Sequence, residues 1–119
     1  MADPMTLARE VESAVLSSPG ETSEALRRAI ASRSAALGGS PAAAAELGRA
    51  AAGEIPAALA PYVDTVARHA YRTTDGDLAA LAVAGYSEDA IFEATLAAAV
   101  GVGLARLERG LAALHGGKP

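Results

Sequence analysis

One short segment, from His69 to Asp77, carries most of the side chains that could do chemistry. The segment contains five different functional groups: the imidazole of His69, the phenol of Tyr71, the guanidinium of Arg72, the hydroxyl of Thr73 and the carboxylate of Asp77. A histidine near a carboxylate or a phenol can transfer protons at neutral pH, so acid–base catalysis by His69 with Asp77 or Tyr71 is one interpretation. The other is structural: Thr74 and Asp77 have the spacing of a helix cap, and the remaining groups can pair locally or stay in solvent. We favour the structural interpretation, because polar groups gather at helix starts for packing as well as for catalysis.

Other chemistries lack the residues that they need. The chain has no cysteine, which excludes disulfides, thiolate metal sites and thiol redox cycles. His69 near Asp75 and Asp77 does not predict a metal, because acids are expected at a helix start in any case. Gly101 and Gly103 lack the strand and the further glycines of a dinucleotide-binding loop. We therefore expect no metal and no cofactor.

The elements that must position these groups are predicted to be helices throughout. Alanine, the strongest helix former, fills 32 of the 119 positions, and only 3% of the residues are aromatic, so strands are not expected. Turn and capping residues divide the chain into an all-α bundle of six helices in a single domain, residues 1–119. The expected helices run from 4 to the Pro19–Gly20 break, 22–37, 41 to about 53, 61–72, 75–84 and 88–114, with 115–119 as a tail. Residues 1–53 hold the N-terminal helices of this arrangement.

Charge and hydropathy exclude several kinds of partner. The net charge of −4 and the absence of a basic stripe argue against nucleic acid. The N-terminus shows no basic region followed by an apolar run, so no signal peptide is expected. The uncharged run from Ala94 to Ala105 is too short to cross a bilayer. These features predict a cytoplasmic protein without membrane contact.

The first and last helices carry apolar residues at helical spacing. In the first, Leu7, Val11, Ala14 and Val15 form a stripe that we expect to be buried in the bundle. The last helix is apolar on two faces: Ile91, Ala94, Ala98, Val102 and Ala105 on one, and Phe92, Leu96, Ala99, Gly103, Leu107, Leu111 and Leu114 on the other. A helix that is apolar on more than one side must be enclosed, by its own bundle or by a second copy. We therefore predict a homo-oligomer. Gly101 and Gly103 are separately expected to let the backbone of another helix come close.

The order of segments from residue 54 to 114 resembles a known family. The stretch Tyr62 to Ala70 leads into Gly85-Tyr86-Ser87-Glu88-Asp89-Ala90-Ile91 and then into a long alanine- and glycine-rich helix. This order is similar to the carboxymuconolactone decarboxylase and alkylhydroperoxidase D superfamily of small helical proteins. The match is most specific from 61 to 114. In the residues before 61 it is limited to the helical periodicity of the sequence.

The resemblance implies an alkylhydroperoxidase D-like helical fold and assembly into trimers or hexamers. Redox members carry a Cys-x-x-Cys-x-x-x-His motif, and counting back from Gly85 places Ala70 and Thr73 at its cysteine positions and Asp77 at its histidine position. The nearest upstream acid, Glu54, is too far away for the family's proton-relay glutamate. The resemblance thus predicts a cysteine-less, non-redox relative without peroxidase activity, an oligomeric binding or structural protein that could take a small apolar ligand or a protein partner. The alternative is a divergent lactone-decarboxylase-like enzyme that uses acid–base residues near His69.

Overall fold

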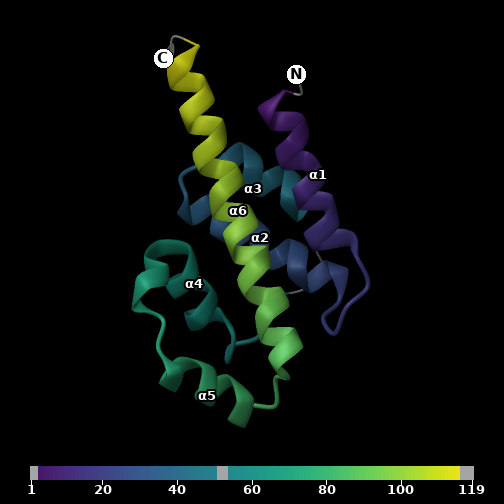
Figure 1. Cartoon of the computed structure of the whole chain (residues 1–119), viewed down its shortest axis with the longest axis vertical. Helices are drawn as coiled ribbons and strands as arrows, with labels where there is room; N and C mark the ends of the chain where they lie inside the picture. The colour runs from purple at the N-terminus through teal and green to yellow at the C-terminus, as the bar shows by residue number, and fades with distance from the viewer. Residues whose placement is uncertain (1–2, 51–53, 116–119) are drawn as a thin grey trace.

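The computed structural model describes residues 3–50 and 54–115, and this part of the chain is helical with no strands. Six α-helices and two short 3-10 helices follow one another along it (Figure 1). They are α1 (Pro4–Ser17), α2 (Glu24–Leu37), α3 (Pro41–Leu47), η1 (Gly48–Ala50), α4 (Ala60–His69), η2 (Ala70–Arg72), α5 (Asp75–Val83) and α6 (Glu88–Leu114). The predicted all-α class with six helices is confirmed for the described residues. The predicted end of the third helix at Gly53 and the tail 116–119 lie outside them.

Local sequence signals set most of the helix boundaries. A side-chain oxygen caps the first backbone amides of five helices, those of Asp3, Ser23, Ser40, Thr74 and Ser87, as Asp, Ser and Thr do at helix starts. Gly85 follows α5 with a φ of 106°, a left-handed conformation that glycine adopts without strain. The fourth helix is shorter than predicted: it stops at His69, and Ala70–Arg72 tighten into the 3-10 turn η2.

The long helix α6 runs through the molecule, with α2 crossing it at close range (Figure 1). One predicted face of α6 is buried, with Ala98 and Ala105 completely enclosed. At Gly101 the two helices approach so closely that a β-carbon there would overlap the backbone oxygen of Ala31. Alanine and glycine thus supply little side-chain volume, but they allow helix backbones to approach closely, so that a core of small residues is still well packed. The prediction for Gly101 is confirmed.

Helix α1 is rotated relative to its prediction. Leu7 and Val11 were expected in the core but are 50% and 55% exposed, so that expectation is wrong. The helix buries Leu16 and packs Met5, Ala8 and Val15 against the core instead. The charged residues Arg9 and Glu12 of α1 lie on the inner side of the helix, where Arg9 reaches carboxylates of α3 and α6.

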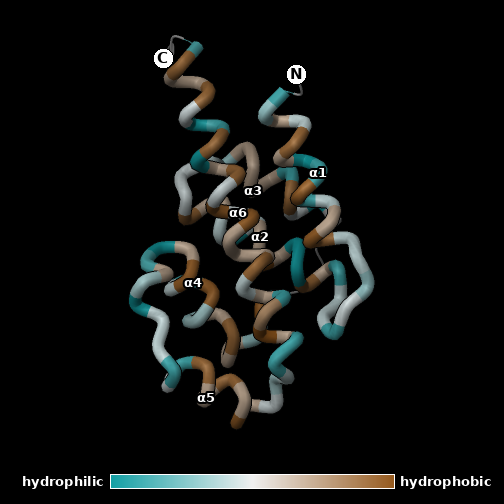
Figure 2. The backbone as a smooth tube through the Cα atoms, viewed as in Figure 1, coloured by the Kyte–Doolittle hydropathy of each residue, from teal (hydrophilic) through white to brown (hydrophobic). Residues whose placement is uncertain are grey.

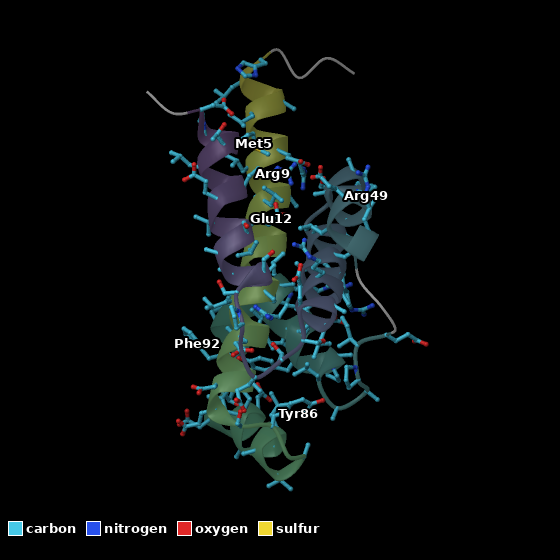
Figure 3. All side chains as sticks on the ribbon, turned by 90° about the vertical axis from the view of Figure 1, so that its right-hand side faces the viewer. Met5, Arg9, Glu12, Arg49, Tyr86 and Phe92 are labelled. Carbon is cyan, nitrogen blue, oxygen red and sulfur yellow. The ribbon has the colours of Figure 1, made fainter. Side chains whose placement is uncertain are left out.

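Ion pairs connect the inner side of α1 with its neighbours (Figure 3). Arg9 contacts Glu12 at 3.0 Å and Glu46 of α3 at 2.5 Å, and its second terminal nitrogen lies 3.8 Å from Glu108 of α6. Arg28 of α2 pairs with Glu24 at 2.8 Å, as its spacing suggests. These pairs form between side chains that remain partly solvated, so each of them adds little stability.

A second ion pair joins α2 to α4. Asp64 and Arg68 have the spacing of a pair within one helix, but Asp64 binds Arg33 through two hydrogen bonds of 2.5 and 2.6 Å. The hydrogen bond from Arg33, followed by the charges of Arg33 and Arg68, lowers the pKa of Asp64 below its ordinary value despite partial burial. This contact spans 31 residues of sequence, so local spacing does not reveal it.

Helix α6 has one further property. Among the described residues it is the one helix long and apolar enough to cross a membrane by length and composition, with half of its most apolar window buried inside the protein. Core helices of globular proteins meet the same criterion, so this property does not by itself assign α6 to a membrane.

Candidate functional site

His69 is the last residue of α4, and Tyr71 and Arg72 lie on the exposed 3-10 turn η2 that follows it. The Tyr71 hydroxyl is 3.5 Å from Nδ1 of His69, the two rings meet edge to face with centroids 5.7 Å apart, and the Arg72 guanidinium lies 5.7 Å from the Tyr71 ring centre. Tyr71 is 78% exposed. The sequence therefore brings these three groups together, but on a surface rather than in a water-excluding cavity.

Thr73 and Asp77 serve backbone amides and carbonyls in this structure. The Thr73 hydroxyl donates to the carbonyl of Ala70 at 2.8 Å. Asp77 accepts from the amide of Thr74 at 3.0 Å, and the Thr74 hydroxyl accepts from the amide of Asp77 at 3.1 Å. This reciprocal arrangement is a capping box, which satisfies two otherwise unpaired amides at the start of α5.

The five candidate residues do not line a common cavity. His69 and Arg72 border one small polar groove with Asp64 and Arg68, whereas Asp77 borders a different groove beside α4 and α5. Over the described residues, no group of three or more metal-ligating side chains comes together. The arrangement offers exposed hydrogen-bonding groups that are divided between two grooves.

An apolar groove between α1 and α6 is the more distinctive surface feature. Its lining comes from one side of each helix: Ala8, Val11 and Val15 of α1, with Leu96, Ala99, Val100, Gly103, Leu104 and Leu107 of α6. The groove measures about 360 Å³, and no charged side chain lines it. It coincides with the second apolar face predicted for α6, which the bundle leaves largely open.

Gly103 lies in this groove with free space in front of it. A β-carbon at this position would meet nothing within 4 Å, in contrast to Gly101 on the opposite flank of the helix. Glycine in a helix interior costs about 1 kcal/mol relative to alanine. Within one copy of the chain, Gly103 brings no packing that offsets this cost, so the prediction that it allows close helix approach is not met inside the bundle.

Polar contacts outside the groove connect α1 and the loop that follows it to α6. At one end Glu93 accepts hydrogen bonds from the amides of Glu21 and Thr22 at 2.9 and 2.8 Å, and from the Thr22 hydroxyl at 2.5 Å. Burial alone would raise the pKa of Glu93, but these bonds and the charge of Arg27 lower it below its ordinary value. Within α1 itself, Arg9 contacts Glu46 of α3 and Glu108 of α6. Contacts outside the groove lining therefore connect the two helices that form it.

Apolar residues continue beyond the groove at both ends of the face. Leu7 lies above it on α1, and Phe92 projects from α6 on the side away from α2 and α3, with 62% of its surface exposed (Figure 3). Leu114 near the end of α6 is 79% exposed. In Figure 2, hydrophobic residues recur along α1 and α5. Apolar surface on this scale, grouped along two helices, is typical of an interaction site.

The sequence predicts the α6 side of this apolar surface but not its α1 side. The positions of α6 were predicted as a separate apolar face, but Val11 and Leu7 were assigned to the core of the bundle. The signal that could have found them is the charge pattern of α1: Arg9 and Glu12 are spaced to pair on the inner side, which turns Leu7 and Val11 outward.

The comparisons with known proteins do not name a class for this site. The chain matches no protein-family model, no curated protein and no solved structure.

Proposed function

We propose that this protein is a homo-oligomeric helical binding or structural protein, a cysteine-less relative of the carboxymuconolactone decarboxylase and alkylhydroperoxidase D superfamily without peroxidase activity. The open apolar groove between α1 and α6 carries the proposal. A second copy of the chain is its occupant, in an assembly such as the trimer or hexamer that the family resemblance implies. The turn at Gly85 and the Ser87 cap, which join α5 to α6, lie in the segment on which that resemblance rests.

The shape and charge of the face favour a second copy over another partner. Leu7 and Val11 of α1 are exposed, and Val11 lines the same groove as Gly103, where an added β-carbon would meet nothing, so one apolar surface combines exposed side chains with open space that a copy of them could fill. Such self-complementarity is what an interface between identical subunits needs. The groove has no charged lining, which gives a charged partner nothing to pair with. Burial against a copy would also give Gly103 the close approach that it lacks within one chain.

The absence of cysteine supports the second part of the proposal. Ala70 and Thr73 stand where redox members of the resembled family have their cysteines, and neither side chain can form a thiolate. Thr73 is engaged with the backbone of Ala70. Purified protein is expected to turn over organic hydroperoxides no faster than a heat-denatured sample, and thiol-independent turnover that depends on folded protein would refute this part.

The interface is tested with a matched pair of substitutions on exposed positions of α6. Ala99→Glu places a charge in the groove, whereas Ala112→Glu makes the same change on an exposed position outside it. Light scattering after size-exclusion chromatography is expected to give an oligomer for the unmodified chain and for Ala112→Glu, and monomers for Ala99→Glu. Equal masses for both variants would show that the groove is not the interface.

A further inference from the structure

A small polar groove runs along one side of α4 and the turn η2 that follows it. Its volume is about 210 Å³, and five polar side chains line it: Asp64, Thr65, Arg68, His69 and Arg72. These positions recur at the spacing of one helix face, so the groups share a single side of the element. In Figure 1, α4 lies to the left of α6 and α1 to its right. A groove of this volume is below the range of typical small-molecule pockets and suits a compact polar group.

Two arginines of this groove have no ion-pair partner in the part of the chain that the structure describes. Arg68 stands four residues after Asp64, its expected partner on the helix, but both carboxylate oxygens of Asp64 accept hydrogen bonds from Arg33, at 2.5 and 2.6 Å. Among the described residues, neither Arg68 nor Arg72 pairs with a carboxylate. Arg72 lies 5.7 Å from the ring centre of Tyr71, a contact with the ring face that uses none of its N–H groups. Like charges about one helical turn apart repel each other, so an anion bound between the two arginines would offset that repulsion.

The remaining polar groups of the groove add few donors. The Thr65 hydroxyl donates its hydrogen to the carbonyl of Pro61 at 3.0 Å, so it offers a ligand an acceptor alone. Nδ1 of His69 lies 3.5 Å from the Tyr71 hydroxyl. A ligand therefore meets chiefly the N–H groups of the two guanidiniums, with the His69 ring as a further donor in its protonated form.

The charges around the groove favour an anion although the whole chain is acidic. The protein has a net charge of −4, but three guanidiniums lie in or beside this groove, those of Arg33, Arg68 and Arg72, and its lining holds a single carboxylate, that of Asp64. The two hydrogen bonds from Arg33 compensate the charge of Asp64 and engage both of its oxygens. The charges of Arg68 and Arg72 thus remain, and together they match the charge of about −2 that a phosphate monoester carries at neutral pH.

We propose that this groove binds the phosphate group of a small phosphate monoester, held between Arg68 and Arg72. Guanidinium groups donate paired N–H bonds that match the geometry of phosphate oxygens. A carboxylate or a phosphodiester brings one negative charge, so either leaves part of the cationic charge of the groove unmatched. Because the groove is small, it takes the phosphate group, and the rest of the molecule lies outside it.

This inference goes beyond the proposed function and does not depend on it. The polar groove and the groove of α1 and α6 have no lining residue in common. A monomeric protein that binds the monoester would remove the oligomer and leave the phosphate site. An oligomer that binds no monoester would do the reverse.

The test uses three probes: methyl phosphate, dimethyl phosphate and inorganic phosphate. Binding to isotope-labelled full-length protein is followed at neutral pH, in buffer without other phosphate, through the side-chain Nε–H resonances of Arg68 and Arg72. Methyl phosphate is expected to bind saturably, about fivefold more tightly than the singly charged diester, and more weakly as the ionic strength rises. Inorganic phosphate is expected to bind no more tightly than methyl phosphate. Equal binding of monoester and diester would overturn the proposal, and so would binding of inorganic phosphate without methyl phosphate.

Matched substitutions of exposed arginines complete the design. Arg68→Gln and Arg72→Gln each remove one guanidinium and are expected to weaken methyl phosphate binding about fivefold or more. Arg106→Gln makes the same change at an exposed position of α6 outside the groove and is expected to leave the affinity unchanged. Full affinity in a folded double variant of Arg68 and Arg72, or an equal loss in Arg106→Gln, would contradict the assignment.

Discussion

The two glycines of α6 allow the assignment of its buried face and its open face to be tested within a single helical turn. Gly101 contacts α2, where an added β-carbon would overlap the backbone oxygen of Ala31, and Gly103 faces open space in the α1–α6 groove. The perturbation is the same in both cases, glycine to alanine. Since the helix propensity gain is also the same, any difference in stability comes from the surroundings of the two positions.

The magnitudes follow from this geometry. Alanine stabilises a helix interior by about 1 kcal/mol relative to glycine. Overpacking costs about 1–3 kcal/mol, and Gly101 belongs at the upper end because the obstacle is backbone, which can yield only if two helices separate. We therefore expect Gly101→Ala to lower the free energy of unfolding by about 2 kcal/mol, and Gly103→Ala to raise that of the monomer by about 1 kcal/mol.

Urea unfolding at a protein concentration low enough to populate the monomer measures both values. Oligomerisation adds a concentration-dependent term, and Gly103→Ala is expected to reduce this term because a methyl group then occupies the recess. Equal destabilisation by both substitutions would refute the assignment of the two faces. A Gly101→Ala protein as stable as the unmodified chain would show that α2 and α6 do not meet as described.

Four further substitutions test individual contacts, each by chemical denaturation of the variant beside the unmodified chain. The folded pKa of Glu93 lies below its ordinary value of 4.5, so its contribution to the free energy of unfolding is complete above that value and is lost as the pH falls through the lower folded pKa. Glu93→Gln should therefore lower the free energy of unfolding by about 2 kcal/mol at neutral pH and by progressively less in acid. A loss of stability that does not change with pH would contradict the role of the charge. Asp64→Asn should cost about 0.5–1 kcal/mol, since its partner Arg33 is half exposed, and a loss of several kcal/mol would mean that the pair is far less solvated than described. Thr74→Ala removes the cap of α5 and should cost about 1 kcal/mol, whereas an unchanged stability would exclude the capping box in solution. His69→Ala should change stability by less than about 0.5 kcal/mol because the side chain is exposed, and a larger loss would place His69 in a packed environment.

The parts of the fold that depend on neighbouring residues could be predicted from the sequence. Ser87 caps α6 and Gly85 ends the preceding helix because both effects act within a few residues. The buried face of α6 was also predictable, since apolar residues at helical spacing mark the side that must leave water. The close approach at Gly101 followed from the same pattern, because a glycine inside a long apolar helix has a cost that close packing can offset.

The parts that depend on distant residues could not be predicted in this way. Arg9 of α1 pairs with Glu46 of α3, and Asp64 pairs with Arg33 of another helix rather than with Arg68 of its own. Neither partner can be identified from spacing along the chain, because the alternative exposed ion pairs differ in free energy by less than about 1 kcal/mol. The candidate chemistry at residues 69–77 was visible as a set of residue types, but its exposure on the turn after α4 depends on where the helix stops.

We propose above that a second copy of the chain covers the open apolar face of α1 and α6. Sedimentation equilibrium of the unmodified protein over a range of micromolar concentrations measures whether the chain associates. We expect an average mass of at least twice 11.8 kDa at the highest concentration, falling toward that of a single chain on dilution. A mass of 11.8 kDa at every concentration would refute the proposal.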